Sequence, residues 1–261
     1  RTDFMQAGFN PLGTALVVLY ADGELEHYNL SGKQTWREGL SLPSIMFRIS
    51  PDASTLALLG EGQLYLYDIL TRSLIKKPVH AKIRLLEFYK NCLVLGGYQD
   101  SLLLLRPNGS ILKTLKFDEY IRQFKVSSYA DRLLIADEKH NLICLDMDGK
   151  VEWLLEKFWI ISEINITEKG DTGYVLINPN SLIKLDISGA AFFEFTDQSP
   201  CKIFSLSAFG KRLLIWDMEN TLTLFDENQA ALWRADFPYA LKHIQLSPKG
   251  DFFYTIDQDL C

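Results

Sequence analysis

The most regular pattern in the chain is the stretch NLICLDMDGKVEW at Asn141–Trp153. A polar residue and a Leu open a short alternating apolar run that ends at an Asp, and a Gly and a Trp follow at fixed distances. Alternation of this length is typical of a half-buried strand, and Asp-x-x-Gly is typical of a tight turn. The stretch therefore predicts a strand, a turn and a second strand.

The same pattern recurs at a spacing of roughly 40 residues, a period typical of propeller blades. A polar residue and its Leu open each copy, at Glu24-Leu25, Gln63-Leu64, Ser101-Leu102, Asn141-Leu142, Ser181-Leu182, Thr221-Leu222 and Asp259-Leu260. The residue that ends each strand is Asn29, Asp68, Arg106, Asp146, Asp186 or Asp226. The turn residue that follows is Gly32, Thr71, Gly109, Gly149, Gly189 or Gln229. The next strand carries Trp36, Ile75, Lys113, Trp153, Phe193 or Trp233 at one offset. A Gly in the turn supplies positive φ, and an Asp can bond its own backbone there.

Between these copies lie further short runs rich in β-branched and aromatic residues, bounded by turn signals such as SPD, DGE, PNG, KGD and PKG. We therefore predict an all-β fold, a β-propeller of four-stranded antiparallel blades that forms a single domain over residues 1–261. The expected blades are approximately residues 3–40, 43–80, 81–120, 121–160, 161–200 and 201–240, with a partial seventh at 241–261. No long segment has the periodicity of a helix.

The two ends of the chain bear on the number of blades. Asp3–Gly13 matches Ala240–Gly250, so the first innermost strand begins almost at the first residue, whereas the seventh repeat stops early in its third strand. A propeller avoids exposed sheet edges by closing its ring. We therefore expect a seven-bladed ring that is part of a longer polypeptide, with six or eight blades as alternatives.

Composition agrees with a soluble, well-packed protein, because 48% of the residues are apolar and 23% are charged. No apolar run approaches the roughly 18 residues that cross a bilayer, so we expect no membrane span. The net charge of −6 argues against nucleic acid as a partner. The dispersed cysteines give no disulfide framework and favour a cytoplasmic location. A periplasmic or extracellular location stays open, because the chain begins at Arg1 rather than Met.

One turn also carries a family resemblance. The Asp-x-x-Gly-Lys-x-x-Trp arrangement at Asp146–Trp153 resembles the quinoprotein-type (PQQ-like) propeller repeat, and the turns Ser50–Asp52 and Ser247–Gly250 resemble those of WD40 blades. The resemblance implies a propeller, and these families include dehydrogenases, membrane-protein assembly factors and scaffolds, so it leaves function open. The dipeptide Trp216-Asp217 carries little weight, because we place it at the end of a second strand and the WD40 dipeptide closes the third.

Catalytic chemistry finds little support in the sequence. The predicted channel-lining positions are chemically mixed: Gly8, Arg48, Glu87, Lys125, Asn165, Ser205 and Gln245. Arg48 and Lys125 as anion ligands are one interpretation, and ordinary polar lining is the one we favour. Vicinal cysteines, expected of PQQ dehydrogenases, are missing. The four His residues lack metal-ligand spacing, and neither a Gly-x-Ser-x-Gly elbow nor a P-loop occurs. We expect no catalytic residue, cofactor or metal, although two carboxylates from different blades remain an alternative.

Sorting the loops by face gives the functional hypothesis. Loops that join second to third strands, and fourth strands to the next blade, are rich in Asp and Glu and carry several aromatics, whereas the opposite loops are roughly neutral. We predict that the acidic face docks a basic protein segment, because aromatics anchor and carboxylates steer Lys and Arg. The predicted contact residues are Asp100, Glu119, Tyr120, Glu138, Trp159, Asp217, Glu219, Tyr239 and Asp257.

Two alternatives to docking remain. Acidic loops also keep a β-rich protein in solution, and loop aromatics also pack between blades. A different class of function, a small-molecule binder or metal-dependent enzyme at the channel mouth, would require a pocket with convergent polar groups. The sequence therefore predicts a non-catalytic interaction or scaffold propeller and names neither its partner nor its oligomeric state.

Overall fold

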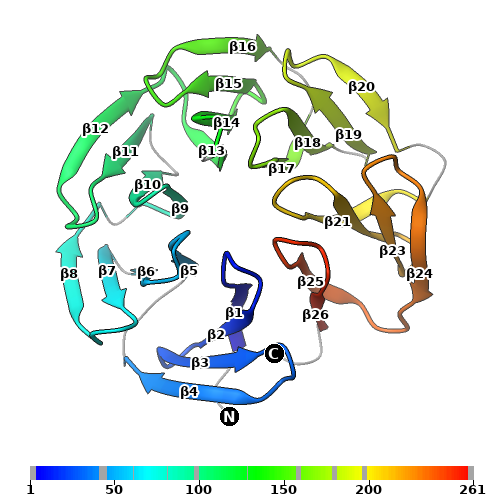
Figure 1. The fold of residues 1–261 in the computed structure, drawn as a ribbon. Helices are drawn as coiled ribbons and strands as arrows, with labels where there is room; N and C mark the ends of the chain where they lie inside the picture. Colours follow the sequence, from blue (N-terminus) through cyan, green and yellow to red (C-terminus); the bar gives the residue numbers. More distant parts are fainter. Residues whose placement is uncertain are drawn as a thin grey trace. The chain divides into compact units, whose positions relative to one another are not determined.

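The computed structural model describes residues 4–40, 46–60, 62–80, 82–96, 100–127, 129–156, 160–177, 181–195 and 199–257. The chain divides into two compact units, one formed by Arg1–Tyr120 and the other by Ile121–Leu260. Within the described ranges there is no helix long and apolar enough to cross a bilayer. Strands joined by short turns build both units (Figure 1).

The unit Arg1–Tyr120 contains three four-stranded sheets, each a meander in which consecutive strands pair antiparallel. The first sheet comprises β1 (Phe4–Phe9), β2 (Ala15–Tyr20), β3 (Glu24–Asn29) and β4 (Gln34–Gly39). The second comprises β5 (Met46–Ile49), β6 (Thr55–Gly60), β7 (Gln63–Asp68) and β8 (Leu74–Pro78). The third comprises β9 (Leu85–Tyr89), β10 (Cys92–Gly96), β11 (Ser101–Leu105) and β12 (Ile111–Lys116).

The unit Ile121–Leu260 contains three more four-stranded sheets and one of two strands. The fourth sheet comprises β13 (Ile121–Ser127), β14 (Arg132–Asp137), β15 (Leu142–Asp146) and β16 (Val151–Leu155). The fifth comprises β17 (Ile161–Ile166), β18 (Thr172–Ile177), β19 (Ser181–Asp186) and β20 (Ala191–Glu194). The sixth comprises β21 (Cys201–Leu206), β22 (Arg212–Asp217), β23 (Thr221–Asp226) and β24 (Ala231–Asp236), and the last pairs β25 (Leu241–Leu246) with β26 (Phe253–Asp257). The prediction of an all-β propeller with six complete blades and a partial seventh is confirmed.

The predicted turn chemistry is present between third and fourth strands. Asp146 Oδ1 accepts hydrogen bonds from the backbone N–H of Asp148 and of Lys150, both at 2.9 Å, and Gly149 has a φ of 86°. Asp186 and Asp226 close their turns in the same way. The side chain of each Asp thus replaces the backbone pairing that ends at the turn.

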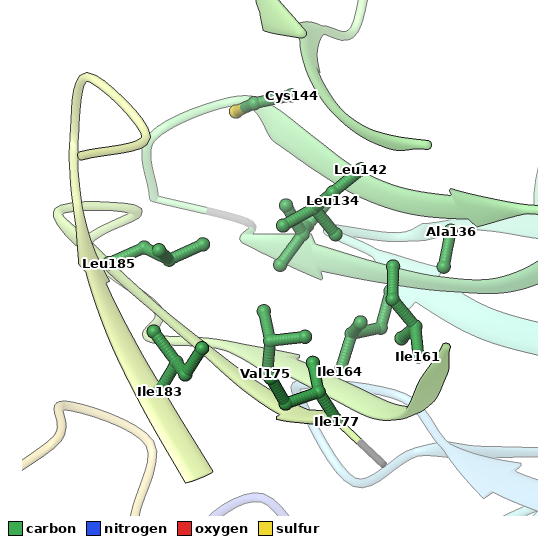
Figure 2. Close-up of a cluster of buried hydrophobic side chains, with 10 residues drawn as sticks. All are labelled: Leu134, Ala136, Leu142, Cys144, Ile161, Ile164, Val175, Ile177, Ile183 and Leu185. Atoms are coloured by element: carbon green, nitrogen blue, oxygen red, sulfur yellow. The ribbon is translucent and has the colours of Figure 1, made fainter. Parts of the chain in front are cut away.

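The Leu that opens each repeat is a core residue. In the six complete blades these leucines are at most 1% exposed: Leu25, Leu64, Leu102, Leu142, Leu182 and Leu222. Figure 2 shows the apolar cluster between the fourth and fifth sheets, in which Leu134 and Leu142 face Ile164, Val175 and Leu185. The core therefore lies between neighbouring sheets. Burial of each such side chain stabilises the fold by about 1.5–3 kcal/mol, so this core holds the sheets together.

Inner strands of neighbouring sheets are also joined by hydrogen bonds between residues about one repeat apart. Gln123 on β13 spans to β17: its Nε2 donates to Ser162 O at 2.7 Å and its Oε1 accepts from Ile164 N at 3.1 Å. Ser205 Oγ on β21 accepts from Leu246 N on β25 at 2.8 Å. These bonds fix the spacing of the inner strands of neighbouring sheets.

Candidate partner-binding surface

Three of the predicted contact residues are exposed in the turns of the unit Ile121–Leu260. Glu138 lies in the β14–β15 turn and Glu219 in the β22–β23 turn, and both side chains are exposed. Tyr239 follows β24 and is 59% exposed. The β24–β25 loop contacts the β22–β23 turn directly, because Phe237 N donates to Asn220 O at 2.9 Å. By the order of strands in each sheet, all three residues lie at the same end of their sheets.

Asp217 corrects one of the predicted contacts. This side chain is only 3% exposed, and its Oδ1 accepts from Glu219 N and Thr221 N, both at 2.9 Å. Asp137 has the same role in the β14–β15 turn, two sheets earlier: it is 4% exposed, and its Oδ1 accepts from Asn141 N at 2.8 Å. Both carboxylates stabilise their turns and are not available to a partner.

The sequence carried a signal for this correction. In the β22–β23 turn the residue three positions after the Asp, Asn220, has a φ of 63°, and His140 has a φ of 64° in the β14–β15 turn. These turns therefore repeat the geometry of Asp146–Lys150, with Asn or His in place of the Gly. Because Asn tolerates positive φ better than most residues, the spacing Asp-x-x-Asn was readable as a turn.

Lys202 places a positive charge beside this surface, which the sequence did not reveal. Its Nζ lies 4.2 Å from the centroid of the Trp216 ring and donates to Asn220 Oδ1 at 3.0 Å. Trp216 is 3% exposed, and its Nε1 has no hydrogen-bond partner within the described residues. As predicted, Trp216-Asp217 ends a second strand, β22. The local field at the β22–β23 turn is thus less negative than the count of carboxylates indicates.

The remaining predicted contacts fall elsewhere. In the unit Arg1–Tyr120, Asp100 is exposed, Glu119 is half-buried and Tyr120 is 50% exposed, with Asp100 O accepting from Phe117 N at 2.6 Å. Trp159 and the side chain of Asp257 lie outside the described residues. Asp100, Glu119 and Tyr120 are therefore a set of their own, on a different unit from Glu138, Glu219 and Tyr239.

Two glutamates at the acidic end of the sheets in the unit Arg1–Tyr120, Glu24 and Glu38, are paired with arginines. Arg37 binds Glu24 through both Nε and Nη2, and Arg72 Nη1 lies 3.7 Å from Glu38 Oε2. The pairing neutralises part of the charge, because an exposed ion pair presents little net field to a ligand. Glu138 and Glu219 have no ion pair with another described residue.

The predicted channel-lining residues are largely occupied with one another or with neighbouring strands. Arg48 Nε lies 3.0 Å from Glu87 Oε2, and its Nη2 lies 3.2 Å from Glu87 Oε1. Ser205 holds β25 as described above, and Gln245 Oε1 accepts from Tyr254 OH at 2.6 Å. Arg48 is thus committed to a carboxylate, which supports its interpretation as polar lining over that of an anion ligand.

Three buried groups of the unit Ile121–Leu260, Glu163, Cys144 and Cys201, have raised pKa values. Burial raises the pKa of Glu163 on β17 to about 7, and the nearby Lys125 partly opposes this. Burial, Glu163 and Asp217 raise the pKa of the Cys201 thiol well above its usual range, and burial together with Glu152 raises that of Cys144 to about 12. Both thiols are therefore protonated and poor nucleophiles at neutral pH. Among the described residues, no three His, Cys, Asp or Glu side chains are grouped to hold a metal ion.

Comparisons with known proteins identify the fold. No family model matches the chain, and no curated protein matches its sequence. Among solved structures, KlHsv2 with loop 6CD replaced by a Gly-Ser linker is similar at a TM-score of 0.78 and 12% identity, over 99% of this chain and 91% of that one. The Cps50 (Swd1) β-propeller domain of Myceliophteria thermophila is similar at a TM-score of 0.78 and 14% identity, over 100% and 94%. The chain is therefore a β-propeller structurally similar to WD40-type propellers, and at this identity the likeness shows the fold alone.

Proposed function

We propose that this propeller is a non-catalytic interaction module and that Glu138, Glu219 and Tyr239, here called the acidic surface, dock a basic segment of a partner protein. The observation that supports it most directly is the exposure of these three side chains at one end of the sheets, free of ion pairs within the described residues. WD40-type propellers commonly act as interaction scaffolds, which agrees with the proposal by analogy of fold.

The turns that carry the acidic surface are held before any ligand arrives. Asp137 and Asp217 accept hydrogen bonds from the backbone of their own turns. Glu138 and Glu219, which lie in these turns, therefore have fixed main-chain positions. Binding to a rigid surface costs less conformational entropy than binding to a mobile loop. The two glutamates therefore orient a ligand and order only their own side chains when it binds.

The aromatic and acidic groups have different tasks. Exposed carboxylates raise the association rate and select Lys or Arg, but salt screens them and each contributes little affinity. Tyr239 provides apolar area that a ligand can bury, and its hydroxyl can bond water at the edge of the interface. The proposed ligand is therefore a segment with Lys or Arg residues on both sides of an apolar side chain, and salt is expected to weaken its binding.

The test uses the whole protein and two fluorescein-labelled twelve-residue peptides that share one apolar centre, one flanked by Lys and Arg and the other by Glu. Fluorescence anisotropy at low and physiological salt measures binding to wild type, to E138Q/E219Q and to Y239S. The matched controls are E227Q and Y129S. E227Q removes an exposed carboxylate from the β23–β24 turn, and Y129S removes an exposed tyrosine from the β13–β14 turn, both at the opposite end of the sheets.

We expect the basic peptide to bind wild type and to weaken about fivefold or more in E138Q/E219Q and in Y239S, with less salt dependence in the charge variant. The controls should bind the basic peptide as wild type does. Full affinity of the basic peptide in both surface variants would remove the acidic surface as the site. A pull-down from native extract with wild type and E138Q/E219Q then identifies the partner.

A further inference from the structure

The most exposed aromatic side chain of the unit Ile121–Leu260 lies at the opposite end of the sheets. Tyr129, in the β13–β14 turn, is 75% exposed, and Phe209, in the β21–β22 turn, is 43% exposed. Their rings meet edge to face, with centroids 5.5 Å apart and planes at 61°. The two turns belong to sheets that are not neighbours in sequence, so the rings reach each other past the β17–β18 turn of the fifth sheet.

These two aromatics occupy one position of the repeat, and lysines occupy it in the turns between and after them. The four residues Tyr129, Lys169, Phe209 and Lys249, here called the rim, each stand 40 positions from the next, and all are exposed. Aromatic and cationic side chains therefore alternate from turn to turn. Lys211 adds a third exposed cation two residues after Phe209.

The turns beneath the rim are bonded to one another. Ser127 Oγ donates to Glu168 O at 2.6 Å, Glu168 N donates to Ala208 O at 2.6 Å, and Ala208 N donates to Pro248 O at 2.9 Å. A single hydrogen-bonded chain thus links the four successive turns. The rim side chains consequently stand on a backbone that is already ordered, which lowers the entropy that binding costs.

Close packing between these turns also depends on glycine. A Cβ on Gly170, whose φ is 65°, would lie 2.5 Å from Ala130 Cβ, and one on Gly210, whose φ is 70°, would lie 2.8 Å from Thr167 Cγ2. Both glycines sit one position after a rim residue. They allow the turns to approach closely enough for Tyr129 and Phe209 to touch.

The lysines of the rim favour an anionic ligand. Lys169, Lys211 and Lys249 have no ion pair or side-chain hydrogen bond within the described part of the chain. Among the carboxylates of the same turns, Asp171 Oδ1 accepts from Thr167 Oγ1 at 2.7 Å, and Asp131 and Glu168 have further interactions. Asp131, Asp171 and Asp251 are exposed and keep their charge, so the preference for an anion rests on the place of Lys169 and Lys249 on either side of Phe209 in the repeat.

We propose that the rim is a second docking site, which binds an acidic protein segment by burying one of its apolar side chains against the Tyr129–Phe209 pair. Rigid aromatics with few rotatable bonds are efficient anchors, and carboxylates of the segment pair with Lys169 and Lys249 on either side. The site lies at the end of the sheets away from Glu138, Glu219 and Tyr239, and it is independent of the function proposed for them.

The first experiment pans a phage-displayed random dodecapeptide library against the whole protein, after subtraction on Y129S/F209S. Enriched peptides are synthesised with fluorescein, and anisotropy measures their affinity for wild type, Y129S/F209S, K169Q/K249Q and the acidic-surface variant Y239S. Both substituted pairs are exposed, so the variants are expected to fold, and circular dichroism and thermal unfolding verify this before binding is compared.

We expect the enriched peptides to carry Asp or Glu around an aliphatic or aromatic residue. Their affinity should fall at least tenfold in Y129S/F209S, and severalfold in K169Q/K249Q with a weaker salt dependence, and should be unchanged in Y239S. Enrichment of basic or uncharged peptides, the absence of any enrichment, or full affinity in Y129S/F209S would overturn the proposal. Loss of binding in Y239S with retention in Y129S/F209S would assign the peptides to the acidic surface instead.

Discussion

The unit Ile121–Leu260 contains two contacts between neighbouring sheets, here called joints, that are built from the same repeat of the sequence. They differ at one side chain of the inner strand. In the first joint, between the fourth and fifth sheets, Gln123 both donates to Ser162 O and accepts from Ile164 N. In the second, between the fifth and sixth sheets, the corresponding residue is Glu163, which has no hydrogen bond to another described side chain or backbone group and has a pKa raised to about 7.

The difference between the joints follows from what each group can donate. Lys202 and Phe204 occupy the positions of the repeat that correspond to Ser162 and Ile164, whose C=O and N–H bond to Gln123. An amide satisfies both groups, whereas a carboxylate only accepts and would face a carbonyl oxygen. A protonated Glu163 regains a donor. The first joint thus has a side-chain link in the structure, whereas the second has a carboxyl group whose burial favours its protonated form.

The largest expected effect on stability comes from removing one core leucine from either joint. Leu142 packs in the core of the first joint and Leu182 in the core of the second, and each is 0% exposed. L142A and L182A should each lower the free energy of unfolding by about 2–5 kcal/mol, because each leaves a cavity in a packed core. Urea unfolding at constant m-value measures the loss. L154A, at a position 45% exposed on β16, is the control and should change stability by less than about 1 kcal/mol.

The second prediction separates the joints by pH. A carboxyl whose pKa is raised in the folded state favours folding while it is protonated, so the contribution of Glu163 to stability should be greatest below about 4.5 and should fall as pH rises through about 7. The shift sets an upper limit of about 3 kcal/mol on this fall, at about 1.4 kcal/mol per pKa unit. Among the described residues, Lys125 and the neutral Cys201 thiol interact electrostatically with Glu163.

Unfolding of wild type, E163Q and Q123E between pH 4 and 8 measures this effect. E163Q should lose the downward slope and exceed wild type in stability at pH 8, whereas Q123E should add a slope by giving the first joint the chemistry of the second. The exposed E227Q should follow the wild-type profile. A wild-type slope that survives E163Q would assign the pH dependence to other groups.

The smallest expected effect sharpens the description of the first joint. Trp153 Nε1 donates to Ile187 O at 2.9 Å, and a Cβ on Gly189 would lie 2.8 Å from Trp153 Cδ2. Gly32 has a similar φ, 77° against 82°, with no described atom within 4 Å of its Cβ position. G32A should therefore cost about 1 kcal/mol for backbone strain alone, and G189A about 1–2 kcal/mol more for displacing the indole. Thermal unfolding compares the two, and equal losses would show that the indole moves freely.

Much of the fold could be predicted from the sequence because its determinants are local and repeated. The Leu of each repeat, the Asp-x-x-Gly turns and the strand boundaries all follow from spacing along one blade. The candidate site was predicted less well. The burial of Asp217 could have been inferred from its turn, but the charge of Lys202 beside Asn220 depends on how two strands are placed, and the contact of Tyr129 with Phe209 depends on three sheets. No pattern within one blade encodes these relations.

The hydrogen bonds between sheets described above have a consequence for how the chain folds. Gln123 to Ile164 and Ser205 to Leu246 each join residues 41 positions apart, and Arg132 to Gly170 joins residues 38 apart. Each new sheet therefore closes a loop of one repeat on a neighbour already formed, at a chain-entropy cost that is the same at every step. Assembly within each unit can spread from any sheet to the next, and its speed is governed by the length of one repeat rather than by the length of the chain.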